Sequence, residues 1–277
     1  YDLDKYMDYL EENSKIFSFQ ITIDGVEDIH NERKPHYRNK DSFAKITSNV
    51  DSLLKLGISV SIRINTDPYT MERADELLDY FKEKGWLQYQ NFKAYYALLR
   101  KEVPIKGENG EYSKEMFTQS SFFCTYLQKG LEKQGCGKVM CQDYSVRSVL
   151  TNMLLGKSTP YKSHFCGAQS GMIIFDPLGD IYSCWDVVGQ REYRVGHYMP
   201  DFVLEDTFAD KWFDSRVSKF SCIKCKYVLF CGGGCLANAI RTTGNLQSGT
   251  CNDYPRLFNA EIKYIYNEKI KKGIDEN

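Results

Sequence analysis

The sequence predicts an α/β fold, in which a half-barrel of parallel strands precedes a small cysteine-rich domain. Three strand patterns alternate with amphipathic helices in the first hundred residues, which is typical of parallel strands joined by right-handed crossovers. Two of these strands have one polar face, whereas strands covered by helices on both sides are apolar throughout. Seven regularly spaced cysteines fill the second half of the chain.

The composition excludes several classes of protein. The 277 residues, 42% of them hydrophobic, suffice for one large domain or two medium ones. A net charge of −1 gives no field that would attract nucleic acid or an acidic membrane, and no apolar run approaches the ~20 residues of a membrane span. Abundant cysteine without a secretion signal predicts a cytoplasmic protein. Because the chain starts at Tyr1 without a methionine, we expect an N-terminal portion to precede it.

Each element of the first hundred residues has its own signal. Apolar residues at every second position predict strands at 17–24 and 58–65, and 92–99 reads as a third strand. Helical spacing predicts a short helix near the start of the chain and longer helices at 43–56 and 71–84. Ser42 and Thr70 are suitable N-caps for the two longer helices, and Gly57 and Gly85 follow their ends.

The polar faces of the first two strands predict a ligand-filled interior. They carry the side chains of Gln20, Thr22, Asp24, Arg63 and Asn65. In (β/α) barrels the chemistry lies at the carboxyl ends of the strands, which places Asp24 and Asn65 at the rim of the site. An internal salt bridge would explain Arg63 and Asp24 equally well when each is taken singly. Five inward polar residues on two adjacent strands favour a ligand.

The middle of the chain is less informative. Residues 101–113 contain proline and glycine and are predicted to form a loop, followed by a helix at 114–133 in which Cys124 is a buried core thiol. A glycine-rich loop is predicted at 135–141 and carries Cys136 and Cys141. Either thiol could ligate a metal in the neighbouring domain, and we prefer Cys141.

The remaining cysteines follow a dense and regular pattern. It runs Cys166-x12-Gly179-x4-Cys184, then Cys222-x2-Cys225-x5-Cys231-x3-Cys235, and finally Cys251. Iron–sulfur clusters take four thiolates each, so this set predicts two clusters in one small domain. Structural zinc is the main alternative, since zinc sites also use pairs of cysteines two residues apart. A disulfide scaffold is typical of shorter, secreted chains.

Two local features fit cluster binding. The turn at 176–180 predicts a hairpin that brings Cys166 and Cys184 together. Three consecutive glycines at 232–234 leave backbone N–H groups that can point at thiolates and sulfides and stabilise their negative charge. A simple flexible turn is the alternative interpretation of these glycines.

This arrangement resembles the SPASM domain, the C-terminal extension of many radical S-adenosylmethionine (SAM) enzymes. Residues 19–34 are similar to a barrel segment of that family, with Asp24-Gly25 followed by His30-Asn31 and Arg33, and 61–65 resemble the next barrel strand. The resemblance implies the C-terminal half of a partial (β/α)6 barrel at 1–100, a linker helix and bridging region at 101–160, and a SPASM domain at 161–277. The five polar strand residues would then contact the cofactor.

The resemblance also implies two auxiliary [4Fe–4S] clusters. By matching positions, Cys222, Cys225, Cys231 and Cys251 would ligate an outer cluster, and Cys166, Cys184 and Cys235 an inner one. Some relatives supply a fourth inner ligand from a cysteine six residues before the first motif cysteine. Here that position is Pro160, so the fourth ligand is another residue such as Cys141, or it is absent and leaves an iron site open to substrate.

One motif of the family is missing from this sequence. No CX3CX2C is present, and in the family that motif binds the cluster that cleaves SAM. We therefore expect the chain to be the C-terminal part of a longer enzyme, which would hold SAM and a third [4Fe–4S] cluster.

Two reactions fit the resemblance. Residues 182–189 look like those of maturases that abstract a hydrogen from a ribosomally made peptide and form thioether or carbon–carbon crosslinks. Sulfatase-maturating relatives have an aspartate directly after the second motif cysteine, whereas Trp185 follows Cys184 here and Asp186 comes next. We favour peptide maturation, with a precursor peptide as substrate, flavodoxin or ferredoxin as electron donor, and Asp186 as proton acceptor unless it is a surface carboxylate. Sulfatase maturation and a non-catalytic zinc-binding module are the alternatives.

Overall fold

The computed structural model describes residues 2–99, 117–143, 145–159, 161–206, 208–251 and 253–271. The chain divides into two compact units, Tyr1–Tyr144 and Ser145–Asn277, and each is considered by itself. The predicted division into barrel, bridging region and SPASM domain stays a prediction, and the predicted loop at 101–113 lies outside the described residues.

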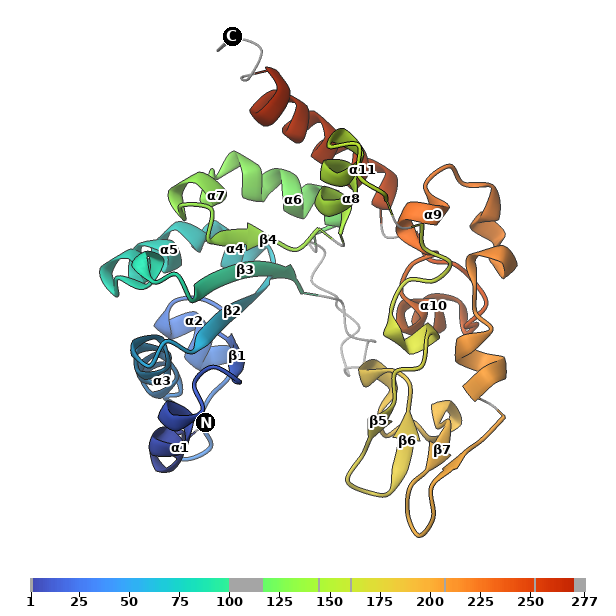
Figure 1. Ribbon diagram of the computed structural model, residues 1–277, viewed down its shortest axis with the longest axis horizontal. Coiled ribbons are helices and arrows are strands. Elements are labelled where there is room, and N and C mark those ends of the chain that lie inside the picture. Colours follow the sequence, from blue (N-terminus) through green and yellow to red (C-terminus); the bar gives the residue numbers. More distant parts are fainter. Residues whose placement is uncertain are drawn as a thin grey trace, which may run out of the picture. The chain divides into compact units, whose positions relative to one another are not determined.

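The first unit is built on a parallel sheet with the strand order β1-β2-β3-β4 (Figure 1). The strands are β1 (Ser18–Thr22), β2 (Ser59–Thr66), β3 (Phe92–Leu98) and β4 (Val139–Cys141). The α-helices are α1 (Met7–Glu12), α2 (Glu27–Arg33), α3 (Phe43–Lys55), α4 (Pro68–Glu72), α5 (Ala74–Glu83), α6 (Gln119–Gln128) and α7 (Leu131–Gln134). Consecutive strands are parallel neighbours, which confirms the predicted α/β class and the strands predicted at 17–24, 58–65 and 92–99.

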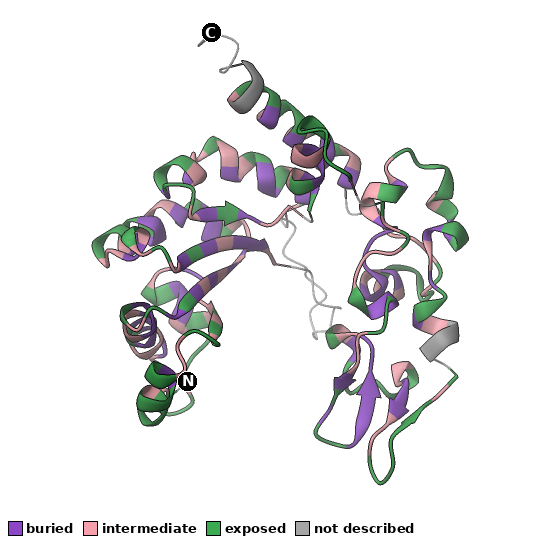
Figure 2. Cartoon of the chain, viewed as in Figure 1, coloured by how far each residue is buried: buried purple, intermediate pink, exposed green. Residues whose placement is uncertain are grey.

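Strand β2 shows how the two faces of this sheet differ (Figure 2). Val60, Ile62 and Ile64 are at most 1% exposed, whereas Arg63 and Asn65 on the opposite face are partly exposed. Burying each of these aliphatic side chains contributes roughly 1.5–3 kcal/mol, which anchors the strand by one face. The other face keeps the polar residues that the sequence predicted there.

Three predictions for the middle of the chain were wrong. The stretch predicted as a loop at 135–141 contains β4, because Val139 is buried and the Ala94 N–H donates to the Lys138 carbonyl at 2.8 Å. The helix predicted at 114–133 is interrupted at Gly130, which has a φ of 64°. Cys124 is exposed rather than buried, because α6 turns Phe122, Phe123 and Tyr126 toward the core and Cys124 lies on another face of the helix.

The start of α3 is held by a residue from the preceding helix. Ser42 occupies the N-cap position as predicted, but its hydroxyl donates to the Lys34 carbonyl. The cap is supplied instead by Asn31 of α2, whose Oδ1 accepts from the N–H groups of Ser42 and Phe43, both at 2.9 Å. Two backbone N–H groups at the helix start, which have no partner within the helix, are thereby hydrogen-bonded to a side chain from the preceding helix.

The prediction that Thr70 caps the next helix was also wrong. A separate helix, α4, begins at Pro68, and Asp67 is its N-cap in a reciprocal capping box with Thr70. The Thr70 N–H donates to Asp67 Oδ1 at 2.9 Å, and the Asp67 N–H donates to the Thr70 hydroxyl at 2.9 Å. A proline at the first helical position suits this start because it has no N–H to satisfy.

The Asn31 cap gives a stability prediction. Asn31→Ala removes the acceptor for two backbone N–H groups, so we expect it to lower the free energy of unfolding by about 1–2 kcal/mol. Urea denaturation followed by circular dichroism measures this loss. Asn39→Ala, at an exposed asparagine whose Oδ1 lies 2.9 Å from Nδ1 of His36, is the matched control and should cost under ~0.5 kcal/mol. Equal losses would contradict the assignment of Asn31 as a cap.

The second unit carries a small antiparallel sheet with the order β5-β6-β7-β8. Its strands are β5 (Ile174–Phe175), β6 (Asp180–Tyr182), β7 (Gly196–His197) and β8 (Val203–Leu204). The predicted hairpin turn is confirmed, since Asp176 Oδ1 accepts from the N–H groups of Leu178 and Asp180 at 2.9 Å and Gly179 has a φ of 98°. A parallel sheet and a small antiparallel sheet together make up the α/β fold.

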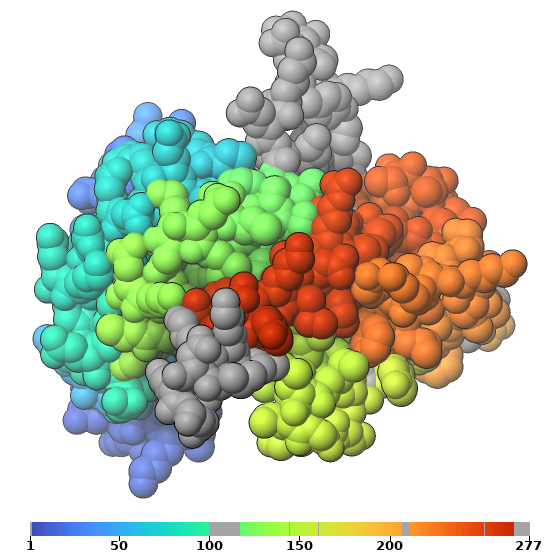
Figure 3. Space-filling view, turned by 90° about the horizontal axis from the view of Figure 1, so that it is seen from above, coloured from blue at the N-terminus to red at the C-terminus, as the bar shows by residue number. Residues whose placement is uncertain are grey.

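The second unit combines helices with an apolar core, to which α9 and α10 contribute Val228 and Leu236. The helices are α8 (Val146–Leu154), α9 (Val228–Cys231), α10 (Leu236–Thr243) and α11 (Tyr254–Ile265). The core contains Tyr182, Trp212 and Phe220, all at most 2% exposed. Helix α11 packs against α8 and, through Phe258, against Phe230 of α9, with ring centroids 5.5 Å apart; Figure 3 shows α11 in red beside this orange segment.

Among the residues given above as described, no helix combines the length and the apolar character that a bilayer span requires.

Candidate functional site

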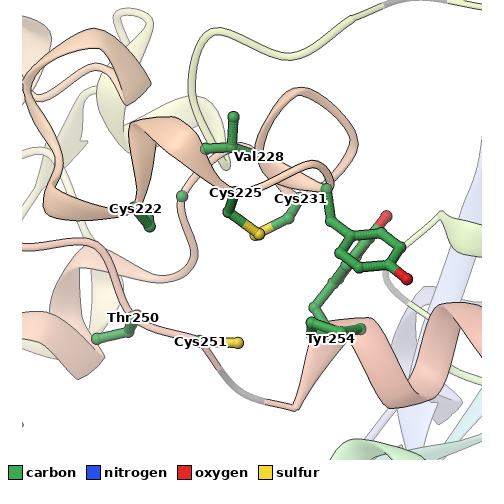
Figure 4. Close-up of a pocket in the computed structure, with 10 residues that line it drawn as sticks. Cys222, Cys225, Val228, Cys231, Thr250, Cys251 and Tyr254 are labelled. Atoms are coloured by element: carbon green, nitrogen blue, oxygen red, sulfur yellow. The ribbon is translucent and has the colours of Figure 1, made fainter.

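Four thiols of the second unit line one open pocket of about 310 Å³ (Figure 4). They belong to Cys222, Cys225, Cys231 and Cys251, and we call this the outer thiol pocket. Tyr227, Val228 and Tyr254 complete much of its apolar wall. The pocket therefore offers four sulfur ligands around a single space.

The segment 222–231 supplies three of these thiols, which short turns bring to the pocket. Cys222 lies in a 3₁₀ turn, and the Cys225 N–H donates to its carbonyl at 2.8 Å, which closes the first pair into a tight loop. Cys231 is the last residue of α9, and its N–H donates to the Tyr227 carbonyl at 2.9 Å. Cys251 comes from the loop before α11, so it reaches the pocket from a different part of the chain.

The three glycines after Cys231 join these two parts. Gly232, Gly233 and Gly234 have φ values of 74°, 86° and 84°, a left-handed region that costs other residues about 1–2 kcal/mol each. A Cβ on Gly234 would lie 2.0 Å from the Thr250 carbonyl oxygen, and the Thr250 N–H donates to the Gly233 carbonyl at 2.8 Å. The segment thus makes a close backbone contact with the loop that ends in Cys251.

The thiols of the outer pocket are held in a low-polarity environment. Burial raises the pKa of Cys231 to about 11, although a hydrogen bond from the Gly233 N–H lowers it in part and the neighbouring thiolates raise it again. Burial likewise raises the pKa of Cys222, with the charges of Cys225 and Cys251 adding to the effect. Without a metal these groups keep their protons near neutral pH, and metal binding would replace those protons.

Three other cysteines form a second set, which we call the inner thiol group. Burial raises the pKa of Cys184 to about 11; the Asp186 N–H donates to its sulfur and lowers it, and the charges of Asp186, Cys235 and Cys166 raise it. Cys166 and Cys184 both pack against the apolar core of the unit. Cys184, Cys166 and Cys235 are therefore electrostatic neighbours, as the predicted hairpin required.

A buried glutamine fixes Cys166 within the inner thiol group. The Gln169 N–H donates to the Cys166 sulfur, and Gln169 Oε1 accepts from the Phe165 N–H at 2.9 Å. Gln169 is fully buried, and its Nε2 donates to the Ser215 carbonyl at 2.5 Å. The sequence analysis missed this residue, because a glutamine three positions after a cysteine gives no distinctive signal.

Four cysteines around one pocket match the number of thiolates that an iron–sulfur cluster takes. Among the residues that the structure describes, no three His, Cys, Asp or Glu side chains converge closely enough to hold one metal ion.

The remaining predicted site residues of the cysteine-rich half lie in different settings. Cys141 is buried on β4 in the first unit, where its thiol donates to the Gln142 carbonyl at 3.8 Å, and Cys136 is exposed. Asp186 approaches Arg241 of α10, with 3.8 Å between carboxylate and guanidinium. The roles of Cys141 as a ligand and Asp186 as a proton acceptor stay predictions.

The polar face of the first unit carries a hydrogen-bond network at the ends of β1 and β2. Asp24 is 4% exposed, and its Oδ1 accepts from both the backbone N–H and the Nδ2 of Asn65, at 3.2 and 2.9 Å. Arg63 Nε donates to Asn65 Oδ1 at 2.9 Å, so Asn65 lies between Arg63 and Asp24. Gln20 lies on the same sheet face and accepts from the Tyr95 hydroxyl at 2.7 Å.

Residues of α2 and its C-terminal end brace this network, and the sequence analysis gave them no role. The Asp24 N–H donates to Nδ1 of the fully buried His30, and burial lowers the pKa of His30, so the ring is neutral. Arg33 donates to the Asn65 carbonyl at 3.2 Å and pairs with Asp67. Lys34 lies 3.7 Å from the free oxygen of Asp24. The His30-Asn31 and Arg33 motif was the signal that could have identified them.

Comparisons with curated proteins identify relatives over nearly the whole chain. No family model matches. The serine-type anaerobic sulfatase-maturating enzyme of Bacteroides thetaiotaomicron is 22% identical over 285 residues, covering 95% of this chain and 66% of that enzyme. The cysteine-type anaerobic sulfatase-maturating enzyme of Clostridium perfringens is 24% identical over 235 residues, covering 82% of this chain and 60% of that enzyme. The chain spans roughly three fifths to two thirds of the length of these relatives.

Solved structures share the fold. The chain matches anSMEcpe with bound AdoMet at a TM-score of 0.66 and 17% identity, over 98% of this chain and 69% of that one. This chain is therefore similar in sequence to anaerobic sulfatase-maturating enzymes and similar in fold to anSMEcpe. Streptococcus suis SuiB bound to precursor peptide SuiA also matches, at a TM-score of 0.53 and 14% identity, over 91% of this chain and 62% of that one. The family resemblance seen in the sequence is thereby confirmed.

The close contact at Gly234 gives a prediction with a built-in control. Gly244→Ala places a residue at a φ of 69° with open space around it and should cost about 1–2 kcal/mol. Gly234→Ala adds a clash with the Thr250 backbone and should cost a further ~1–3 kcal/mol. Guanidinium denaturation of the metal-free proteins measures both. Equal losses for the two variants would show that the contact does not constrain the fold.

Proposed function

We propose that this chain forms the later barrel strands and the SPASM domain of a radical SAM maturase that modifies a ribosomally made peptide. The observation that carries the proposal is the gathering of four thiols around the outer pocket. The distant homology to maturating enzymes supports the same class. The activity, substrate and partners of the whole protein belong to this proposal, because the chain covers only part of its relatives' length.

The thiols would hold two auxiliary [4Fe–4S] clusters. Cys222, Cys225, Cys231 and Cys251 would ligate the outer cluster, and the inner thiol group would ligate the other. Cys141 is the proposed fourth inner ligand, unless that position stays open to substrate. When bound, such clusters accept and pass single electrons.

This chain's own groups would prepare the outer pocket for that charge. The Gly233 N–H already donates to the Cys231 sulfur, and the same bond would stabilise a thiolate ligand. The apolar wall would lower the local dielectric constant and exclude water. Both effects shift the reduction potential of a cluster, so the backbone contact and the burial are the protein's means of tuning it.

In the first unit, the polar face would bind SAM. The proposed contacts are Gln20, Thr22, Asp24, Arg63 and Asn65. Asp24, Arg63 and Asn65 are already ordered by mutual hydrogen bonds and by His30 and Arg33 beneath them. Such preorganisation reduces the loss of side-chain entropy when a ligand binds.

Two substrates remain in competition. Crosslinking of a precursor peptide is favoured by residues 182–189, in which Trp185 and not an aspartate follows Cys184. Sulfatase maturation is favoured by the similarity to two anaerobic sulfatase-maturating enzymes. In either reaction Asp186 is the proposed proton acceptor, and Arg241 beside it would hold its carboxylate in place. A flavodoxin or ferredoxin would exchange electrons with the enzyme in a reducing, cytoplasmic setting, which suits ten free thiols.

Iron content tests the cluster assignment. After anaerobic reconstitution we expect about eight iron atoms per chain, corresponding to two four-iron clusters, and Cys222→Ala should lower this to about four. Cys124→Ala, at an exposed cysteine on α6, is the control and should keep the full content. Iron and sulfide analysis with visible absorption gives the readout. Zinc at one or two per chain without visible absorbance would favour the non-catalytic zinc module instead.

Substrate choice is tested with the full-length parent protein. We expect it to modify a short precursor peptide encoded beside it, with a loss of hydrogen and a new crosslink detected by tandem mass spectrometry. A sulfatase-derived peptide is the matched competitor in the same reaction. Modification of the sulfatase peptide alone would replace our first choice by the alternative.

A further inference from the structure

The segment around the outer thiol pocket has an unusual charge distribution. From Ser215 to Cys251 the chain contains five basic residues and no aspartate or glutamate. The basic residues are Arg216, Lys219, Lys224, Lys226 and Arg241. Lys219 and Arg241 face the carboxylates of Asp214 and Asp186, so the positive charge that bears on the outer pocket is mainly that of Lys224 and Lys226, on the segment that supplies three of its thiols.

Part of this charge lies at the rim of the pocket. Lys224 and Lys226 flank Cys225 in sequence, and both lysines and the Cys225 thiol are exposed. Lys226 lies over the ring of Tyr227, 5.1 Å from its centroid, and Tyr227 lines the pocket. Its ammonium group is therefore placed beside the opening.

Apolar side chains accompany the two lysines. Ile223 and Leu229 are 45% and 43% exposed, respectively. We call Ile223, Lys224, Lys226 and Leu229 the lysine rim. Exposed apolar residues among positive charges are typical of protein-binding surfaces, in which the charges steer the partner and the apolar groups supply the contact.

Compensation of the cluster's own negative charge is a competing explanation for the lysines. The thiols, however, receive charge stabilisation at short range from the backbone, as the Gly233 N–H bond to Cys231 shows. Ammonium groups in bulk water act on a buried charge only weakly, because the solvent screens them. Their field extends outward and acts on whatever approaches the surface.

We propose that the lysine rim docks a small acidic one-electron carrier protein of the ferredoxin class. The inference rests on the proposed function, since it requires a cluster in the outer pocket. Cys225 and Cys251 are exposed, so a carrier seated on the rim would bring its own cofactor close to ligand atoms of that cluster. One electron leaves the carrier's iron–sulfur centre and one enters the four-iron cluster, with no bond made or broken.

Charge reversal tests the docking. Lys224→Glu combined with Lys226→Glu should slow reduction of the clusters by a reduced acidic [2Fe–2S] ferredoxin at least ~10-fold at low ionic strength. Lys15→Glu combined with Lys55→Glu changes the net charge equally at exposed lysines of the first unit and should leave the rate within about twofold. Stopped-flow absorbance measures both, and the difference should shrink as salt is added.

Three further measurements make the outcome decisive. Iron is measured first, in each variant and in the unsubstituted protein. If the unsubstituted protein contains no clusters, both the proposed function and the docking are refuted. With clusters present, equal ferredoxin rates for the two double variants would overturn the docking alone. Reduction by a photoreduced deazaflavin, a small carrier that does not depend on the rim, should be equal in all variants. Tight binding of an oligonucleotide that competes with ferredoxin for the rim would assign this surface to nucleic acid instead.

Discussion

The cysteine-rich unit depends on one backbone contact, between the glycines at 232–234 and the loop that ends in Cys251. Three consecutive residues in the left-handed region leave room for the Thr250 carbonyl at a distance that no side chain would allow. The Thr250 N–H and the Gly233 carbonyl close the contact with a hydrogen bond. Because Cys231 precedes the glycines and Cys251 follows Thr250, this contact sets the separation of thiols twenty positions apart in sequence.

The same segment also stabilises negative charge on the buried sulfur of Cys231. Thiols in an apolar pocket lose solvation when they ionise, which is why the pKa of Cys231 rises to about 11. Ligation of a metal cluster would require the thiolate, so the pocket has to supply another source of stabilisation. The Gly233 N–H supplies it at the sulfur of Cys231 itself. The exposed lysines lie too far into solvent for that task, which leaves their charge to act on an approaching partner.

In the first unit, side chains stabilise a buried carboxylate, that of Asp24. Asp24 is nearly fully buried, and its carboxylate accepts two hydrogen bonds from Asn65 and lies near the ammonium group of Lys34. Its backbone N–H donates to the ring nitrogen of His30. Arg33 then ties the end of β2 to the end of α2 through the Asn65 carbonyl. The strand ends are thus rigid before any ligand binds, as expected of a binding surface on a parallel sheet.

The sequence by itself determined the fold class, the positions of β1, β2 and β3, and the spacing of the cysteines. Alternation with period two fixes which face of β1 and β2 is polar, and the spacing of the cysteines carries the family resemblance; both are local properties of the chain. The tertiary structure decided what local patterns cannot express. Val139 became a strand residue because β3 offered it a partner, Cys124 turned to solvent because Phe122, Phe123 and Tyr126 filled the core, and Asn31 capped a helix that begins twelve positions later. Each of these outcomes depends on contacts between distant segments, which the hydrophobic pattern of a single segment does not specify.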